Sequence, residues 1–373
     1  MGTGIVSILL NTLPYNGRWL YWISVALFGL NVLLFAIFLA ITTLRYSLYP
    51  NIFPVMITHP AQSLSLGTFP MGFATIINMF CFVCVPSWGV WSSYFAWAMW
   101  IVDAVVSVLT CFGIPFIMNR RCRMTSPNET GLQLMGAAWL LPIVACVVAA
   151  ASGSVVAEVL PHPQYALGTL VASYILWGVG VPFALMVMTI YLMRLMLHKL
   201  PAKVVIVSTF LPLGPLGQGG YVYAISNYYN YRNKITPNIS RIQKLGSVSR
   251  TVFPLTRTLR PGPGDTLYDV GFLLGLFLWA FGSLWLFFAA ASIIRSKKFP
   301  FNLGWWAFTF PLGVYSTCTC QLGREMPSRF FAVLGTVCYP DVYFDHDTDF
   351  SDPVIERRAS LAHSVSFHRE RDP

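Results

Sequence analysis

The chain has 373 residues, of which 56% are hydrophobic and 10% are charged. A soluble domain carries about 25% charged residues, so this composition excludes an ordinary soluble protein and, with a mean hydropathy of +0.63, predicts an integral membrane protein. The formal net charge of +10 is assigned mainly to cytosolic loops. No basic surface interleaved with aromatic residues indicates a nucleic-acid partner; the lipid bilayer is the expected surroundings.

Apolar segments follow one another along most of the chain, which predicts an all-α fold. A helix needs roughly 20 apolar residues to cross a bilayer. The short segment Met1–Leu13 comes first, and Phe330–Tyr339 comes last and is too short to cross, so both resemble fragments of longer helices. The spans expected between them are Trp19–Leu44, Leu66–Pro86, Val90–Met118, Leu132–Val155, Tyr165–Leu197, Val204–Gly220, Val270–Ile294 and Gly304–Gln321.

The positions of lysine and arginine favour a cytosolic N-terminus. In that orientation ten basic residues fall in the inside loops, and three (Arg18, Arg324 and Arg329) fall outside. Cytosolic loops of membrane proteins carry this excess of positive charge. The loop Asn227–Thr266 adds seven more basic residues outside and weakens the contrast.

A phrase of proline, an apolar residue and glycine recurs inside the expected spans. It occurs at 69–72 (FPMG), 211–214 (LPLG) and 310–313 (FPLG), with a weaker form at 141–144 (LPIV). Proline breaks the helical hydrogen-bond pattern, and a broken helix is tolerated in a bilayer where it is buried in protein or lines a cavity. The recurrence predicts several bent helices that converge on one path, with plain packing of bent helices as the alternative.

No expected span has lysine or arginine at its middle. A path through these helices would therefore contact its solute through neutral groups. Backbone N–H groups freed at a bend and the positive ends of helix dipoles are such groups, and they favour anions.

Motifs of enzymes and ATP-driven pumps are missing from the sequence. It has no phosphate-binding GxxxxGK[ST] loop, and its six histidines form no metal-binding pattern. Cys81 and Cys84 have CxxC spacing within an apolar span but no further ligands near them in sequence. We therefore expect no metal, no cofactor and no enzymatic activity.

Asp103 is the one charged residue deep inside an expected span. Carboxylates within a membrane are costly and often functional. The structural alternative is a neutral or hydrogen-bonded carboxyl group that braces neighbouring helices. Both interpretations remain open from the sequence.

Several long strings resemble one family of membrane proteins. HPAQS at 59–63 leading into FPMGFAT at 69–75, LPLGPLGQGG at 211–220 and FNLGWWAFTFP at 301–311 are similar to the fungal sulfite efflux pumps. These pumps belong to the tellurite-resistance and dicarboxylate transporter family, with the yeast malate permeases and the slow anion channels of plants. The similarity covers most of residues 1–220 and 241–334.

The resemblance implies a fold of about ten transmembrane helices, arranged as five hairpins around a central pore. It also implies a homotrimer with one pore in each subunit. A phenylalanine of the ninth helix plugs the pore in this family; Phe310 is the best match and Phe308 the second, with an ordinary packed phenylalanine as the alternative. The residues expected to line the pore are Gly2, Gly4, Phe69, Pro70, Gly72, Pro142, Leu211, Pro212, Gly214, Pro311 and Gly313.

The chain departs from the family pattern in three places. It begins in the middle of the first expected helix, it contains a segment at 221–240 that resembles an insert, and a polar tail at 341–373 replaces the expected tenth helix. A mis-spliced gene model would explain all three. We expect one transmembrane domain over residues 1–340 and a disordered tail over 341–373.

The function expected from these observations is efflux of sulfite or bisulfite across the plasma membrane, driven by the membrane potential and the concentration gradient. A permease for malate or another C4-dicarboxylate, or a general anion channel, is the alternative. A membrane-embedded enzyme would need a cluster of His, Cys or carboxylate residues at mid-membrane, and the sequence predicts none.

Overall fold

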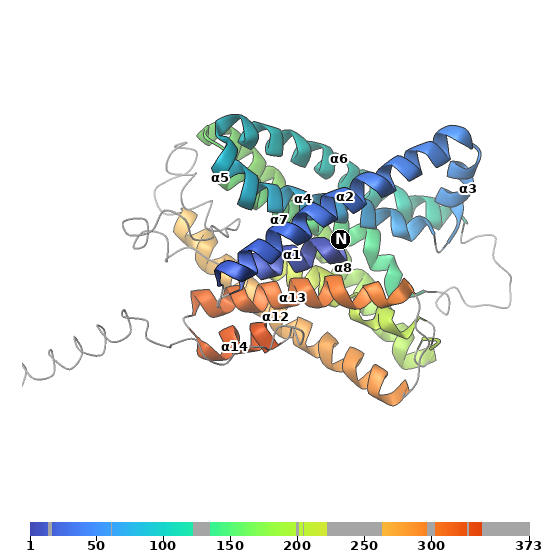
Figure 1. Ribbon diagram of the computed structural model, residues 1–373. Helices are drawn as coiled ribbons and strands as arrows, with labels where there is room; N and C mark the ends of the chain where they lie inside the picture. Colours follow the sequence, from blue (N-terminus) through green and yellow to red (C-terminus); the bar gives the residue numbers. More distant parts are fainter. Residues whose placement is uncertain are drawn as a thin grey trace, which may run out of the picture. The chain divides into compact units, whose positions relative to one another are not determined.

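The computed structural model describes residues 1–13, 17–60, 62–121, 135–198, 201–203, 205–221, 263–296, 303–326 and 328–337. All regular secondary structure in these ranges is helical (Figure 1). The expected insert beyond Tyr221 and the expected tail at 341–373 lie outside the described residues.

The helices fall into long and short classes. The long ones are α2 (Arg18–Leu48), α6 (Val90–Arg121), α7 (Leu141–Val159), α8 (Pro163–His198), α12 (Pro263–Ser296) and α13 (Trp306–Glu325). The shorter ones are α1 (Gly2–Thr12), α3 (Ile52–Thr58), α4 (Thr68–Met79), α5 (Val85–Trp88), α9 (Leu213–Tyr221) and α14 (Arg329–Val337). A π-helical turn, Phe80–Cys84, joins α4 to α5.

Six helical segments within the described residues are long and apolar enough to cross a membrane. They correspond to six of the spans expected from the sequence and run over Arg18–Leu48, Ser63–Trp88, Val90–Met118, Ala137–Val159, Pro163–Leu197 and Asp269–Ser296. The protein is therefore a membrane protein with several spans, and its described part is all-helical. The expected span Val204–Gly220 is instead a 3₁₀ turn, Ile206–Phe210, followed by the short α9.

Burial separates these spans into two groups. The most apolar part of Ala137–Val159 is 94% buried and that of Ser63–Trp88 is 67% buried, whereas the same measure is 6% for α2 and 22% for Val90–Met118. Apolar side chains exposed along a membrane span face lipid. Helices α4 and α7 therefore lie inside the protein, and α2 and α6 lie at its lipid-facing surface.

Five helices, called the inner helices below, form a closed circuit of contacts. Helix α1 contacts α4, α4 contacts α7, α7 contacts α9, α9 contacts α13, and α13 returns to α1. Figure 1 shows α1 and α13, from opposite ends of the described chain, lying side by side. Each of the five also contacts a helix that follows it in the chain: α2, α6, α8, α12 and α14, respectively.

The prolines of the recurrent phrase mark the starts of inner helices. Pro70 and Pro142 lie in the first turns of α4 and α7, and Pro212 immediately precedes α9. A 3₁₀ turn comes before each of these helices. The first N–H groups of a helix have no intrahelical partner, so proline costs no hydrogen bond there. Pro311 differs because it lies inside α13.

Arg324, in the last turn of α13, contacts the C-terminal end of α1. Its guanidinium group donates hydrogen bonds to the backbone oxygens of Thr12 and Leu13, the latter at 3.2 Å. A cation at a helix C-terminus also interacts favourably with the helix dipole. This contact closes the circuit between α1 and α13 at their C-terminal ends.

Close packing of α9 against α13 depends on Gly217. A Cβ atom at this position would lie 2.8 Å from both the Cα and the backbone N of Tyr315. Backbone atoms cannot swing aside as a side chain can, so the two helices approach closely because residue 217 is a glycine.

We predict that Gly217→Ala destabilises the protein by about 1–3 kcal/mol, the usual cost of overpacking. The matched control is Gly214→Ala on the same helix, where the nearest atom to a new Cβ would be Val144 Cγ1 at 3.9 Å. The measurement is the melting temperature of the purified protein in detergent. Equal melting temperatures for the two variants would contradict this account of the α9–α13 contact.

Candidate functional site

A small apolar pocket lies where the five inner helices meet. It offers about 20 Å³ to the centres of water molecules, which is room for about one water. Helices α4, α7, α9 and α13 contribute to it, as does Met1, the residue just before α1. Its lining residues are Met1, Met71, Leu140, Leu141, Val144, Leu211, Gly214, Ala307, Phe310 and Pro311.

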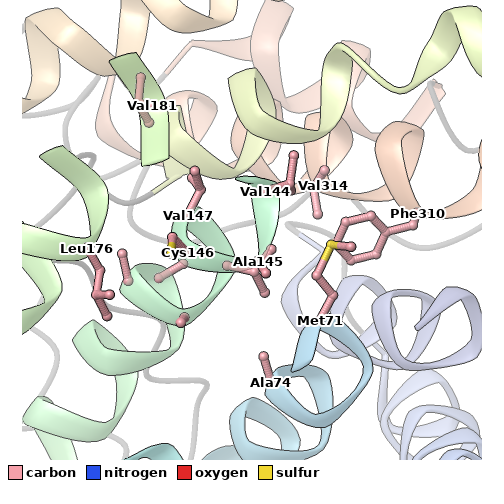
Figure 2. Packing of buried hydrophobic residues seen from close by; sticks show 14 of the residues in the cluster. Met71, Ala74, Val144, Ala145, Cys146, Val147, Leu176, Val181, Phe310 and Val314 are labelled. Atoms are coloured by element: carbon pink, nitrogen blue, oxygen red, sulfur yellow. The ribbon is translucent and has the colours of Figure 1, made fainter. Parts of the chain in front are cut away.

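Phe310 is the largest side chain in this lining and is 4% exposed. Figure 2 shows its ring beside the thioether of Met71, with Val144 and Val314 close by. Sulfur–aromatic contacts of this kind are favourable, and methionine adapts readily to irregular gaps. The ring and the Met71 side chain therefore both face the pocket, from α13 and α4 respectively.

The side chains that line the pocket are neutral, and the pocket lies near the N-terminal ends of α4, α7 and α9. None of its lining side chains carries a charge. Helix N-termini carry a partial positive charge and present unpaired N–H groups. An apolar constriction beside such helix ends suits the passage of a small anion better than that of a cation.

Four of the residues expected to line a pore lie together in this pocket. They are Leu211, Gly214, Phe310 and Pro311. Phe308, the second match for the plug, lies outside the lining and packs against Phe210, with ring centroids 4.8 Å apart.

Other expected lining residues lie elsewhere. Phe69 is 42% exposed and stacks on Phe35 of α2, with ring centroids 5.5 Å apart. A Cβ on Gly313 would lie 2.9 Å from a carbon of Ile5, so Gly313 lies where α13 packs against α1. A Cβ on Gly4 would overlap Thr75 of α4.

Five further residues of the expected set are also outside the lining. A Cβ on Gly72 would lie 3.7 Å from the backbone N of the lining residue Met1 and 3.9 Å from Phe35 of α2, so Gly72 lies between the pocket and α2. Pro70, Pro142 and Gly2 are buried, and Pro142 directly follows the lining residue Leu141. Pro212 precedes α9 next to the lining residue Leu211.

The orientation of each helix explains this distribution. In α7 and α9 the residue before the proline and the second residue after it line the pocket: Leu141 and Val144, Leu211 and Gly214. In α4 the residue after the proline, Met71, takes this place, so α4 is rotated and turns Phe69 outward. The apolar residue–proline pair is common to these helices and does not show their rotation, so the sequence did not indicate Met71.

Asp103 lies away from this pocket, on the face of α6 that packs against α7. It is 1% exposed, and neither carboxyl oxygen has a hydrogen-bond partner among the described residues. One turn to each side, Trp100 donates to the backbone oxygen of Ala149 at 2.9 Å and the backbone oxygen of Ser107 accepts from the Cys146 thiol at 3.4 Å. The neighbouring residues thus hold the two helices together without using the carboxyl group.

We predict that Asp103→Asn leaves anion transport and melting temperature close to those of the wild type. An isolated carboxylate at such a place is costly, and asparagine has the shape of the neutral acid. Transport assays in proteoliposomes and melting in detergent measure the two properties. A large loss of transport by a folded Asp103→Asn variant would assign Asp103 a functional role.

The sequence matches the model of a known protein family. The model of the voltage-dependent anion channel family, SLAC1, matches residues 1–340. The chain therefore belongs to this family of membrane anion channels and transporters, as the sequence strings predicted.

Individual relatives narrow the similarity further. The chain is 49% identical over 336 residues to the sulfite efflux pump SSU1 of Arthroderma benhamiae, which is 90% of this chain and 83% of that protein. The sulfite efflux pump SSU1 of Candida albicans is 29% identical over 359 residues, 90% of this chain and 68% of that protein. The malic acid transport protein of Schizosaccharomyces pombe is 22% identical over 344 residues, 90% of this chain and 72% of that protein.

Proposed function

We propose that this protein exports sulfite or bisulfite through a pore enclosed by α1, α4, α7, α9 and α13. The observation that carries this proposal is the closed circuit of these five helices around a pocket with neutral lining side chains, Phe310 among them. Identity of 49% to a sulfite efflux pump, against 22% to a malic acid transport protein, supports sulfite over malate as the solute.

The proposed architecture is one of ten helices in five hairpins. The contacts of each inner helix with a following helix support it. In this arrangement α2, α6, α8, α12 and α14 form the outer layer, and the pore runs along the inner helices.

The membrane potential is a sufficient driving force for the proposed efflux. With the cell interior negative, one negative charge moving outward gains about 2.3 kcal/mol per 100 mV. This free energy equals a concentration ratio of roughly 50-fold. Export of a monovalent anion therefore requires no ATP, in agreement with the missing phosphate-binding loop.

Phe310 is the proposed plug of the pore. Its ring lines the small pocket between the inner helices, and Met71 in the same lining is flexible enough to move with it. Gly214 supplies the remaining room, because no side chain projects from this position.

Location and assembly are further parts of the proposal. The loop charges support a cytosolic N-terminus, and a plasma-membrane location follows from a role in export. A homotrimer is proposed from the family resemblance. Sedimentation or mass photometry of the purified protein measures its oligomeric state.

The test of function is expression of the chain in a yeast strain that lacks its own sulfite pump. We expect the cells to grow on sulfite and to show no increase in uptake of labelled malate. Malate uptake without sulfite resistance would favour the dicarboxylate alternative. An immunoblot of the membrane fraction checks that the protein is present.

A further inference from the structure

Buried polar atoms without hydrogen-bond partners among the described residues lie on three inner helices: α4, α7 and α13. On α13 the atom is the Ser316 hydroxyl, six residues and so about 120° around the helix from Phe310; the other two are on α4 and α7. Asn78 of α4 is 6% exposed and its Oδ1 has no partner among the described residues. The hydroxyl of Ser152 on α7 is in the same condition, and that residue is fully buried. Burying a polar group without a partner costs about 1–3 kcal/mol by mutational measures, so two of them on adjacent inner helices need an explanation.

The relative height of Asn78 and Ser152 follows from a contact between the starts of α4 and α7. Gly67, just before α4, lies against the start of α7, where its Cβ would be 2.6 Å from the Cα of Pro142. Asn78 comes eleven residues after Gly67, and Ser152 comes eleven residues after Leu141. Eleven residues make about three helical turns and a rise of about 16 Å. Asn78 and Ser152 therefore lie at about the same height above the shared start of α4 and α7.

Both residues also continue the faces that line the pocket. Asn78 is seven residues, about two turns, beyond Met71, and Leu141 is three turns before Ser152. The position one turn beyond Gly214 on α9 is Gln218, which is 6% exposed. Three adjacent inner helices thus carry an amide or a hydroxyl group on their pocket-facing sides, beyond Phe310 toward their C-terminal ends.

A fourth polar residue at this depth is already engaged. Thr317, two turns beyond Phe310 on α13, donates its hydroxyl hydrogen to the backbone oxygen of Gly313 at 2.8 Å. Its hydroxyl hydrogen is used within α13 and is not available to a solute.

We propose that Asn78, Ser152 and Gln218 form a second solute site in the pore, which binds a small oxyanion after it has passed Phe310. The hydroxyl of Ser152 and the amide N–H groups of Gln218 donate to oxygens of the anion, and the unpaired Oδ1 of Asn78 accepts from the hydroxyl of a protonated oxyanion such as bisulfite. Neutral donors hold an anion less tightly than arginine or lysine would, so the anion is replaced by the next one rather than trapped. This inference rests on the proposed transport function and places a second binding site along the same path.

The test is sulfite efflux from proteoliposomes that contain the purified full chain. The variants are Asn78→Leu, Ser152→Ala and their combination, which replace the unpaired groups by apolar ones of similar size. We expect the double variant to raise the KM for sulfite at least about fivefold. We also expect its melting temperature to be unchanged or higher, because an unpaired buried polar group is removed.

Ser154→Ala is the matched control on the same helix. Ser154 is also fully buried, but its hydroxyl donates to the backbone oxygen of Ala151 at 2.6 Å. It lies two residues, or about 200°, around the helix from Ser152. The KM of this variant is expected to equal that of the wild type.

Gln218→Met gives an independent measurement should Asn78→Leu fail to fold. It removes the amide on α9 with little change in volume, and we expect it to raise the KM for sulfite as well. An unchanged KM in the folded double variant, or an equal rise in Ser154→Ala, would overturn the second site. Failure of the wild type to transport sulfite would instead overturn the proposed function.

Discussion

Replacement of Phe310 by alanine is expected to raise sulfite efflux by about tenfold or more. The ring lines the narrow pocket between the inner helices, and alanine leaves the path open beside Met71. A tenfold rise in rate corresponds to a barrier lower by about 1.4 kcal/mol. Initial rates from proteoliposomes, or anion currents across a planar bilayer, measure the effect.

Phe308→Ala is the control for this prediction. It makes the same chemical change two residues away, at a ring that packs on Phe210 and Trp305 outside the pocket lining. We expect it to lose packing stability and to keep the efflux rate of the wild type. Higher efflux in Phe308→Ala, with no change in a folded Phe310→Ala, would transfer the role of plug to Phe308.

Hydropathy predicted six of the membrane spans but not their places in the bundle. Lipid and the protein interior are both apolar, so α2, with 6% of its span buried, is as apolar as α7, with 94% buried. Small residues distinguish the inner helix: α7 contains the run from Ala149 to Ser154, which allows close helix contacts. This difference is visible in the sequence and could have indicated α7 as an inner helix.

The proline–glycine phrase predicted part of the candidate pore. It led to Leu211, Gly214, Phe310 and Pro311, which lie together in the pocket. It did not predict how far each helix is rotated about its own axis, because rotation depends on contacts with the neighbouring helices. Phe69 therefore faces α2 although it has the same place in the phrase as Leu211 and Phe310.

Glycine has two different uses in this protein, which the sequence did not separate. At Gly313 the missing side chain allows α13 to pack on Ile5 of α1, and at Gly214 it leaves open space in the pocket. The motif around both residues is the same, so only the three-dimensional contacts distinguish a packing glycine from one that keeps a path open.

The other large effect is expected at Gly214. Gly214→Leu adds a four-carbon side chain to a pocket with room for about one water, opposite the Phe310 ring. We predict that sulfite efflux falls by about tenfold or more, an added barrier of about 1.4 kcal/mol. Sulfite resistance in yeast and efflux from proteoliposomes should both decrease.

Gly178→Leu is the matched control, because a Cβ at this exposed position of α8 has no atom within 4 Å. The same leucine there should leave efflux unchanged. A melting temperature of Gly214→Leu near that of the wild type would show that the loss comes from a filled path rather than from unfolding. Combining Gly214→Leu with Phe310→Ala should restore part of the efflux, because alanine returns space that leucine takes. Without such rescue in a folded double variant, Gly214 and Phe310 do not share one path.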